Sequence, residues 1–139
     1  KAAMTVGPYE PLASAGVSDL AARARLSRTE ADETGVAPET LWLVRDDVLV
    51  WGIGSSAHPA GADTLISDLA SAVGLTVVRD DGLPDSVLAG DTAFDEVFLV
   101  SDEHGVVPAA DASGDRSERF RQGYAKLLAS MDAKARRPL

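Results

Sequence analysis

The stretch FDEVFLVSDEHGVVP, residues 94–108, holds the clearest strand–turn–strand pattern of the chain. Its segment Glu96–Val100 is dominated by valine, phenylalanine and leucine, a composition typical of a buried strand. The polar residues Asp102–Gly105, which end in a glycine, predict a turn. Val106–Pro108 then returns as a second strand, so the stretch predicts a β-hairpin in the core of the protein.

Further strands are predicted upstream of this hairpin. Thr40–Val44 and Val48–Trp51 are rich in β-branched, leucine and tryptophan residues, and the polar residues 45–47 between them predict a turn. Leu75–Val78 has the same composition and predicts one more strand. The sequence therefore indicates a sheet built from several short strands.

Two longer helices are predicted between and after these strands. One is capped by Asp63, carries apolar residues at helical spacing and stops at Gly74, a residue favoured just beyond the end of a helix. The other is capped by Ser117 and ends in a basic segment, as the helix dipole favours. The apolar face of this second helix consists of Phe120, Tyr124, Leu127, Leu128 and Met131.

The remaining segments predict shorter elements. Ser18 is predicted to cap a helix from Asp19 to about Leu26, and Pro84–Leu88 predicts a single helical turn. The polar residues 27–39 predict either a loop or a frayed helix. No repeat or low-complexity linker divides the chain. The sequence thus predicts one domain, residues 1–139, of the α/β (α+β) class.

The composition excludes several classes of function. The 139 residues contain no cysteine, which excludes disulfides, thiolate nucleophiles and cysteine-based zinc sites. A formal net charge of −9 would repel a nucleic-acid backbone. The carboxylates lack the alternation of a calcium loop, and His104 is interpreted as a solvated turn residue, so no metal site is predicted.

No targeting or membrane segment is predicted. Apolar runs stay well below the ~20 residues of a membrane-spanning helix. The segment after Lys1 lacks the apolar region of a signal peptide. We therefore expect a cytoplasmic protein that does not contact a membrane.

Three segments, taken in order, resemble the large C-terminal domain of the class IV aminotransferases, the fold type IV enzymes that use pyridoxal 5'-phosphate (PLP). Residues 94–108 resemble the family pattern ADEVF-L-T followed by G-V-x-P-V. Residues 60–64, with the small residues that follow, resemble P-G-I-T-R, and residues 40–49 resemble N-x-F-x-V-x-D-G-x-L. The resemblance covers roughly residues 33–130 and rests on order and spacing rather than on any one motif. It implies a mixed, partly barrel-like sheet with flanking helices.

The resemblance also implies a cofactor site. The family's interval places the Schiff-base lysine at Lys1 and the glutamate that pairs with the pyridine nitrogen at Glu33. The phosphate would be held by two turns, which by resemblance begin at Gly61 and at Ser101. The first of these turns consists of Gly61, Ala62 and Asp63.

The function that follows from this resemblance is that of an aminotransferase or an aminodeoxychorismate-lyase-like enzyme. Such an enzyme acts on a small-molecule amino acid, and its family members are commonly homodimers. The small N-terminal domain that helps to close the family's site is not contained in this chain.

Two alternatives remain open. The first is a non-catalytic, cofactor-free relative, which is favoured by acidic residues in both phosphate turns: Asp63 in one, Asp102 and Glu103 in the other. The second is a dinucleotide-binding module that uses residues 52–57, Gly-Ile-Gly-Ser-Ser-Ala, which match G-x-G-x-x-A after a predicted strand. The helix predicted to start near Asp63 lies too far from these glycines to match a true fingerprint, which favours a plain loop.

Overall fold

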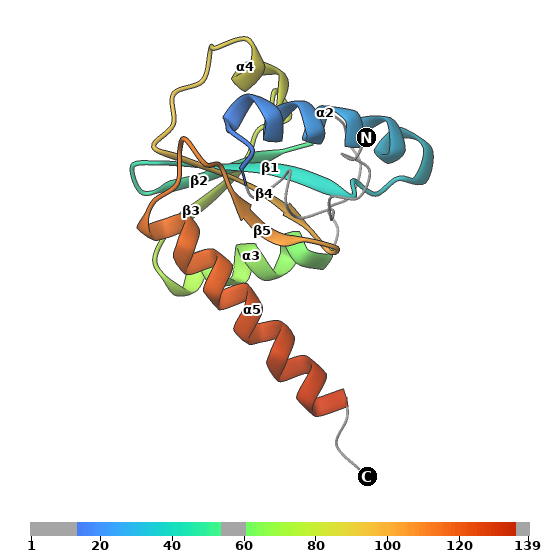
Figure 1. Ribbon diagram of the computed structural model, residues 1–139, viewed down its shortest axis with the longest axis vertical. Coiled ribbons are helices and arrows are strands. Elements are labelled where there is room, and N and C mark those ends of the chain that lie inside the picture. Colours follow the sequence, from blue (N-terminus) through green and yellow to red (C-terminus); the bar gives the residue numbers. More distant parts are fainter. Residues whose placement is uncertain (1–13, 54–60, 136–139) are drawn as a thin grey trace.

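The computed structural model describes residues 14–53 and 61–135. Its centre is a five-stranded mixed sheet with the strand order β3-β2-β1-β4-β5 (Figure 1). The parallel pair β2–β3 stands at one edge, and the other neighbouring pairs are antiparallel. The strands are β1 (Glu39–Arg45), β2 (Val48–Gly52), β3 (Thr76–Arg79), β4 (Glu96–Ser101) and β5 (Gly105–Pro108). The predicted mixed sheet with flanking helices is confirmed.

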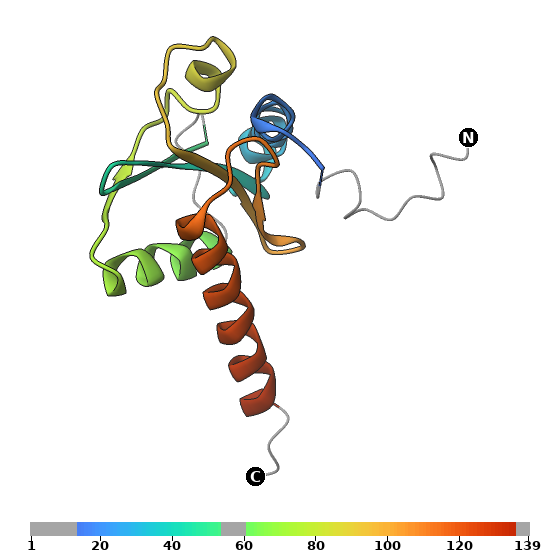
Figure 2. The same ribbon diagram turned by 60° about the vertical axis from the view of Figure 1, so that its left-hand side comes forward.

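Helices cover both faces of this sheet (Figures 1 and 2). One face carries α2 and the short α4, and the other carries α3 and α5. The outer part of α5 extends away from the sheet (Figure 2). The helices are α2 (Val17–Thr34), α3 (Gly61–Ala72), α4 (Asp85–Leu88) and α5 (Asp115–Ala135).

The two faces have separate apolar cores because alternate residues of a strand point to opposite sides. In β1, Trp42 packs in the core under α3 and α5, whereas Leu41 and Leu43 pack in the core under α2. Trp42 is fully buried and stacks on Trp51 with a ring-centroid distance of 5.2 Å. Central strands covered on both faces explain why the sequence shows continuous apolar runs.

For residues 27–39 the sequence left a loop and a frayed helix open, and the structure shows a regular helix over the first part of this segment. Instead of a loop after Leu26, helix α2 continues to Thr34 and ends at Gly35, whose φ of 83° is the left-handed conformation that glycine adopts easily. The buried side of the extension is formed by small residues, Ser27 and Ala31, four positions apart. Because these residues are hardly hydrophobic, the helical period is weak in the sequence.

Three caps were also assigned wrongly. Helix α2 begins at Val17 with Gly16 as its N-cap, so Ser18 is its second residue. Asp63 lies inside α3 as its third residue, and Ser117 is the third residue of α5. The Ser117 hydroxyl nevertheless supports the start of α5, since its Oγ accepts a hydrogen bond of 3.1 Å from the Gly114 amide.

The segment β2–α3–β3 is a βαβ unit, as the sequence indicated. Gly52 at the end of β2 lies directly against the backbone of Asp80, since a Cβ atom at Gly52 would stand 1.9 Å from the Asp80 carbonyl oxygen. The Asp80 amide donates a hydrogen bond of 2.7 Å to the Trp51 carbonyl oxygen. Strand packing therefore explains this glycine, while residues 54–57 of the dinucleotide-like motif lie outside the described residues.

Within the described part of the chain, every helix is too short or too polar to cross a membrane.

Candidate functional site

The two turns expected to hold a phosphate meet at the N-terminus of α3. The β4–β5 turn reaches across to the first residues of the helix, and the Ala62 amide donates a hydrogen bond of 2.8 Å to Asp102 Oδ1. These residues lie 40 positions apart in the sequence. The amide end of a helix attracts anions, and here that anion is a carboxylate of the same chain.

Asp63, in the next helical position, points into the core. The residue is 2 % exposed, and its Oδ1 accepts a hydrogen bond of 3.0 Å from Trp42 Nε1 and another from the Thr40 hydroxyl. Trp42 Nε1 also lies 2.8 Å from Thr40 Oγ1. The three side chains form a buried polar network that ties α3 to β1.

The buried Ser101 side chain forms a hydrogen bond within the β4–β5 turn. It is 3 % exposed, and its Oγ accepts a hydrogen bond of 2.9 Å from the His104 amide. The His104 side chain is only 2 % exposed, so its interpretation as a solvated turn residue was wrong. Because Ser101 already bonds within its own turn, the hydroxyl acts as a brace for that turn.

Tyr124 of α5 covers the same turn. Gly105 has a φ of 71°, and a Cβ atom there would lie 3.2 Å from the Tyr124 ring, so both the backbone conformation and the ring favour glycine. Tyr124 itself is 4 % exposed. Burial, followed by the negative charges of Asp102 and Asp63, raises the pKa of the Tyr124 phenol above its ordinary value of 10.0.

We expect Tyr124 to ionise only at a pH above 10.0 in the folded protein. Because the folded-state pKa is the higher one, its contribution to stability is complete below pH 10.0 and is lost as the pH rises. A pH titration of tyrosinate absorbance should therefore contain a late step that is missing from Tyr124→Phe. In Asp102→Asn that step should move to lower pH. A Tyr124 that titrates with the ordinary pKa would contradict the buried position.

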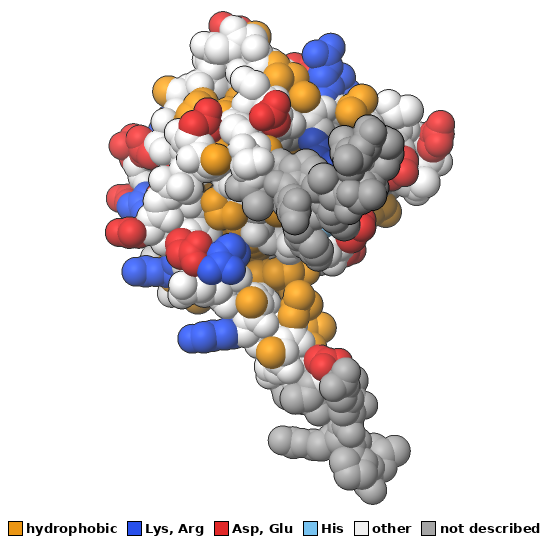
Figure 3. Space-filling view, in the orientation of Figure 1, with side chains coloured by type: hydrophobic (Ala, Val, Ile, Leu, Met, Phe, Trp, Pro, Cys, Tyr) orange, Lys and Arg blue, Asp and Glu red, His pale blue; other side chains and the backbone are white. Residues whose placement is uncertain are grey.

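A groove of about 700 Å³ adjoins this region, between the edge strand β5 and helix α5. Its wall includes Asp102, His104, Tyr124 and Leu128. Hydrophobic side chains continue along α5 beyond the body of the protein (Figure 3). The groove places acidic, aromatic and aliphatic groups together.

The other predicted cofactor residues are not brought to this place by the described structure. Lys1 lies outside the described residues. Glu33 is exposed in the last turn of α2. Among the described side chains the one lysine is Lys126, which is exposed on α5.

The residues at the start of α3 do not fit the phosphate of PLP. The amide that would bind the phosphate already bonds to Asp102, and the Asp63 carboxyl group follows directly in the helix. Like charges about 4 Å apart repel by roughly 1 kcal/mol in water and about 4 kcal/mol near a protein surface. A phosphate would have to displace Asp102 and remain beside two carboxyl groups.

The same type of cap occurs on the other long helices. At α2 the Val17 amide donates to Asp111 Oδ1 over 2.9 Å, and at α5 the Ser117 amide donates to Glu96 Oε1 over 2.8 Å. All three carboxylates come from a different element than the helix they cap. Asp102 therefore belongs to a set of structural caps, each of which stabilises a helix N-terminus.

Comparisons with known proteins bear on the fold. No protein-family model matches the sequence, and no curated protein matches it either. The branched-chain amino acid aminotransferase of Escherichia coli is similar in structure, with 25% identity, a TM-score of 0.51, and coverage of 66% of this chain and 33% of that chain. The T.th. enzyme of the same name, complexed with N-(5'-phosphopyridoxyl)-L-glutamate, has 20% identity, a TM-score of 0.51, and coverage of 84% and 44%.

This chain thus spans about a third of the length of the first solved structures that it matches. The similarity is one of fold, in agreement with the resemblance noted in the sequence. The chain has the fold of the large domain of the class IV aminotransferases.

Proposed function

We propose that this chain is a cofactor-free, non-catalytic relative of the class IV aminotransferases. It keeps the scaffold of the large domain and uses the former phosphate turns to hold that scaffold together. The observation that carries the proposal is the hydrogen bond from the Ala62 amide to Asp102, which fills the anion-binding end of α3 with a carboxylate of the chain itself.

Two further features support this proposal. The buried network of Asp63, Thr40 and Trp42 gives the second acidic residue a structural role. The carboxylate caps of α2 and α5 are further cases in which this chain uses acidic side chains in the same way. A site that had kept its phosphate would instead present amide and hydroxyl donors without carboxylates beside them.

The test compares PLP with pyridoxal, which carries the same aldehyde without the phosphate. The full chain is incubated with each compound, imine formation is followed by absorbance, and borohydride reduction fixes the product. We expect PLP to bind no more than about 2-fold better than pyridoxal, because the carboxylates at α3 oppose the phosphate. An exposed amine such as that of Lys126 can form an imine with either compound, so this background reaction will be the same for PLP and for pyridoxal.

A strong preference for PLP over pyridoxal would contradict the proposal. A preference for PLP of about 100-fold, which corresponds to ~2.7 kcal/mol, together with a label on Lys1, would overturn the proposal. It would show that the phosphate is recognised in spite of Asp102. The chain would then be part of a PLP-dependent aminotransferase or lyase that acts on an amino acid.

A further inference from the structure

A second cavity lies at the opposite end of α3, about 16 Å along the helix from Ala62. It has a volume of about 250 Å³ and is enclosed by the end of α3, the first turns of α5 and the β1–β2 turn. None of the residues discussed above as phosphate turns lines it. Its chemistry is therefore independent of the question of PLP.

The floor and walls of this cavity are apolar. Leu69 and Val73 of the α3 end, Leu75 before β3 and Phe120 of α5 face it. Phe120 is 3 % exposed, whereas Val73 is 46 % exposed. Gly123 of α5 lies close against Leu69 in the cavity wall, since a Cβ atom there would come within 3.3 Å of the leucine side chain. An apolar ligand that covered Val73 would gain the free energy of burying this surface.

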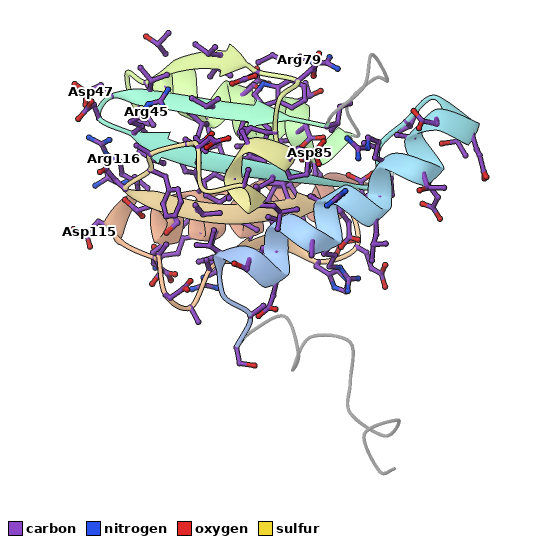
Figure 4. The ribbon with its side chains drawn as sticks, turned by 90° about the horizontal axis from the view of Figure 1, so that it is seen from above. Arg45, Asp47, Arg79, Asp85, Asp115 and Arg116 are labelled. Atoms are coloured by element: carbon purple, nitrogen blue, oxygen red, sulfur yellow. The ribbon has the colours of Figure 1, made fainter. Side chains whose placement is uncertain are left out.

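The rim carries two arginines, Arg116 and Arg119, which are one helical turn apart on α5. Arg116 is held in place, since its Nη2 lies 3.0 Å from Asp47 Oδ1 and its Nη1 bonds to the Asp46 carbonyl (Figure 4). Within the described residues, Arg119 forms no ion pair. Two arginines against the one carboxylate of Asp47 make the rim cationic, on a chain whose net charge is −9.

We propose that this cavity binds a small aliphatic carboxylate. Its apolar tail occupies the space between Leu69, Val73 and Phe120, and its carboxylate bonds to the Arg119 guanidinium at the rim. A planar guanidinium matches a carboxylate with two parallel hydrogen bonds. An uncharged apolar molecule would leave this cation unused, and a bare inorganic anion would leave the apolar walls in water.

The volume sets the size of the ligand. A water molecule in the liquid takes up roughly 30 Å³, so about 250 Å³ corresponds to about eight non-hydrogen atoms. Hexanoate has that number of atoms and an unbranched apolar tail. A larger acid would extend past Val73 into solvent, and acetate would not reach the apolar floor.

The experiment is an NMR titration of the full chain with hexanoate, and with hexan-1-ol as the uncharged probe of the same length. We expect saturable binding of hexanoate with a dissociation constant on the order of 1 mM or below. The chemical-shift changes should be confined to residues at the end of α3, at the start of α5 and in the β1–β2 turn. Hexan-1-ol should bind at least about 5-fold more weakly, because it cannot engage the guanidinium.

Two arginine variants separate a specific contact from a general charge effect. Arg119→Gln should weaken hexanoate about 5-fold or more and leave hexan-1-ol unchanged. Arg121→Gln is the matched control, because Arg121 lies on the same helix, pairs with Glu118 and does not line this cavity. Its affinity for hexanoate should equal that of the original chain.

Other outcomes would overturn the proposal. These are the absence of saturation at ~10 mM hexanoate, ten times the upper dissociation constant expected, or equal losses in Arg119→Gln and Arg121→Gln. Chemical-shift changes spread over the whole protein surface, rather than confined to the cavity, would also overturn the proposal. A Val73→Phe variant, which fills the cavity from its exposed side, should abolish binding of both probes while the dispersed spectrum shows an intact fold. Retained binding in that variant would place the ligand elsewhere.

Discussion

Gly52→Ala is expected to lower the free energy of unfolding by about 3 kcal/mol, because the new methyl group would overlap the backbone of Asp80. The Cβ position stands 1.9 Å from the Asp80 carbonyl oxygen and 2.8 Å from its carbonyl carbon. No side-chain rotation can relieve this overlap. The loop after β3 has to move, which also strains the 2.7 Å hydrogen bond from the Asp80 amide to Trp51. Urea unfolding followed by tryptophan fluorescence measures the loss.

Gly61→Ala is the matched control for that variant. A Cβ atom at Gly61 has Asp102 Oδ1 as its nearest neighbour at 3.9 Å, an ordinary contact. Alanine is also the better helix former, so stability should be unchanged or higher by up to about 0.5 kcal/mol. Equal stability of Gly52→Ala and Gly61→Ala would contradict the close approach of β2 to Asp80 and would reopen a ligand role for Gly52.

The strands could be predicted because their signal is local. In β1 and β4 nearly every residue is buried by helices on both sides of the sheet, so apolar runs such as Val97–Val100 stand out in the sequence. Turns between them contain aspartate and glycine at the positions that need them, as with Asp46 at a φ of 54°. The pairing of β2 with β3 followed from the helix between two short strands.

Helix α2 could be predicted only in part, for a physical reason. Beyond Leu26 its buried stripe is reduced to Ser27 and Ala31, while its exposed side carries the charged residues of a solvated surface. Small buried residues give almost no hydrophobic period, and so the segment has the composition of a loop. The helix forms because tertiary packing on the sheet outweighs the local pattern.

The candidate site could be located but not interpreted from the sequence. The resemblance to the class IV aminotransferases assigned the Gly61 and Ser101 turns to one site, and the acidic residues in both turns were visible in the sequence. The direction of each carboxyl group could not be derived, because it depends on partners far away in the chain. Asp63 bonds to Trp42, 21 positions earlier, and Asp102 bonds to Ala62, 40 positions earlier. Tyr124, which covers the site, was classed with the core face of its helix, and only the fold shows what that face covers.

Asp63→Ala should lower the free energy of unfolding by about 2 kcal/mol, since it removes the carboxyl group that two buried donors share and leaves them only the Thr40 hydroxyl and the more distant Val100 carbonyl oxygen as acceptors. These donors are Trp42 Nε1, 3.0 Å from Asp63 Oδ1, and the Thr40 hydroxyl. Asp63→Asn keeps a side-chain oxygen at the same position and should lose less than half as much. Asp68→Ala, an exposed position on the same helix, should change stability by no more than about 0.5 kcal/mol. Chemical denaturation of the three variants gives these differences directly.

The order of these three variants also decides between two views of the former phosphate turn. If stability falls in the order Asp68→Ala, Asp63→Asn, Asp63→Ala, the carboxyl group is an acceptor that holds α3 against β1, and its presence is explained by folding alone. If Asp63→Ala is as stable as the original chain, the buried carboxyl group contributes nothing to the fold. A buried polar group that does not stabilise the fold is a candidate for a functional role. That result would restore Asp63 as a candidate functional residue and would remove one of the supports for a purely structural turn.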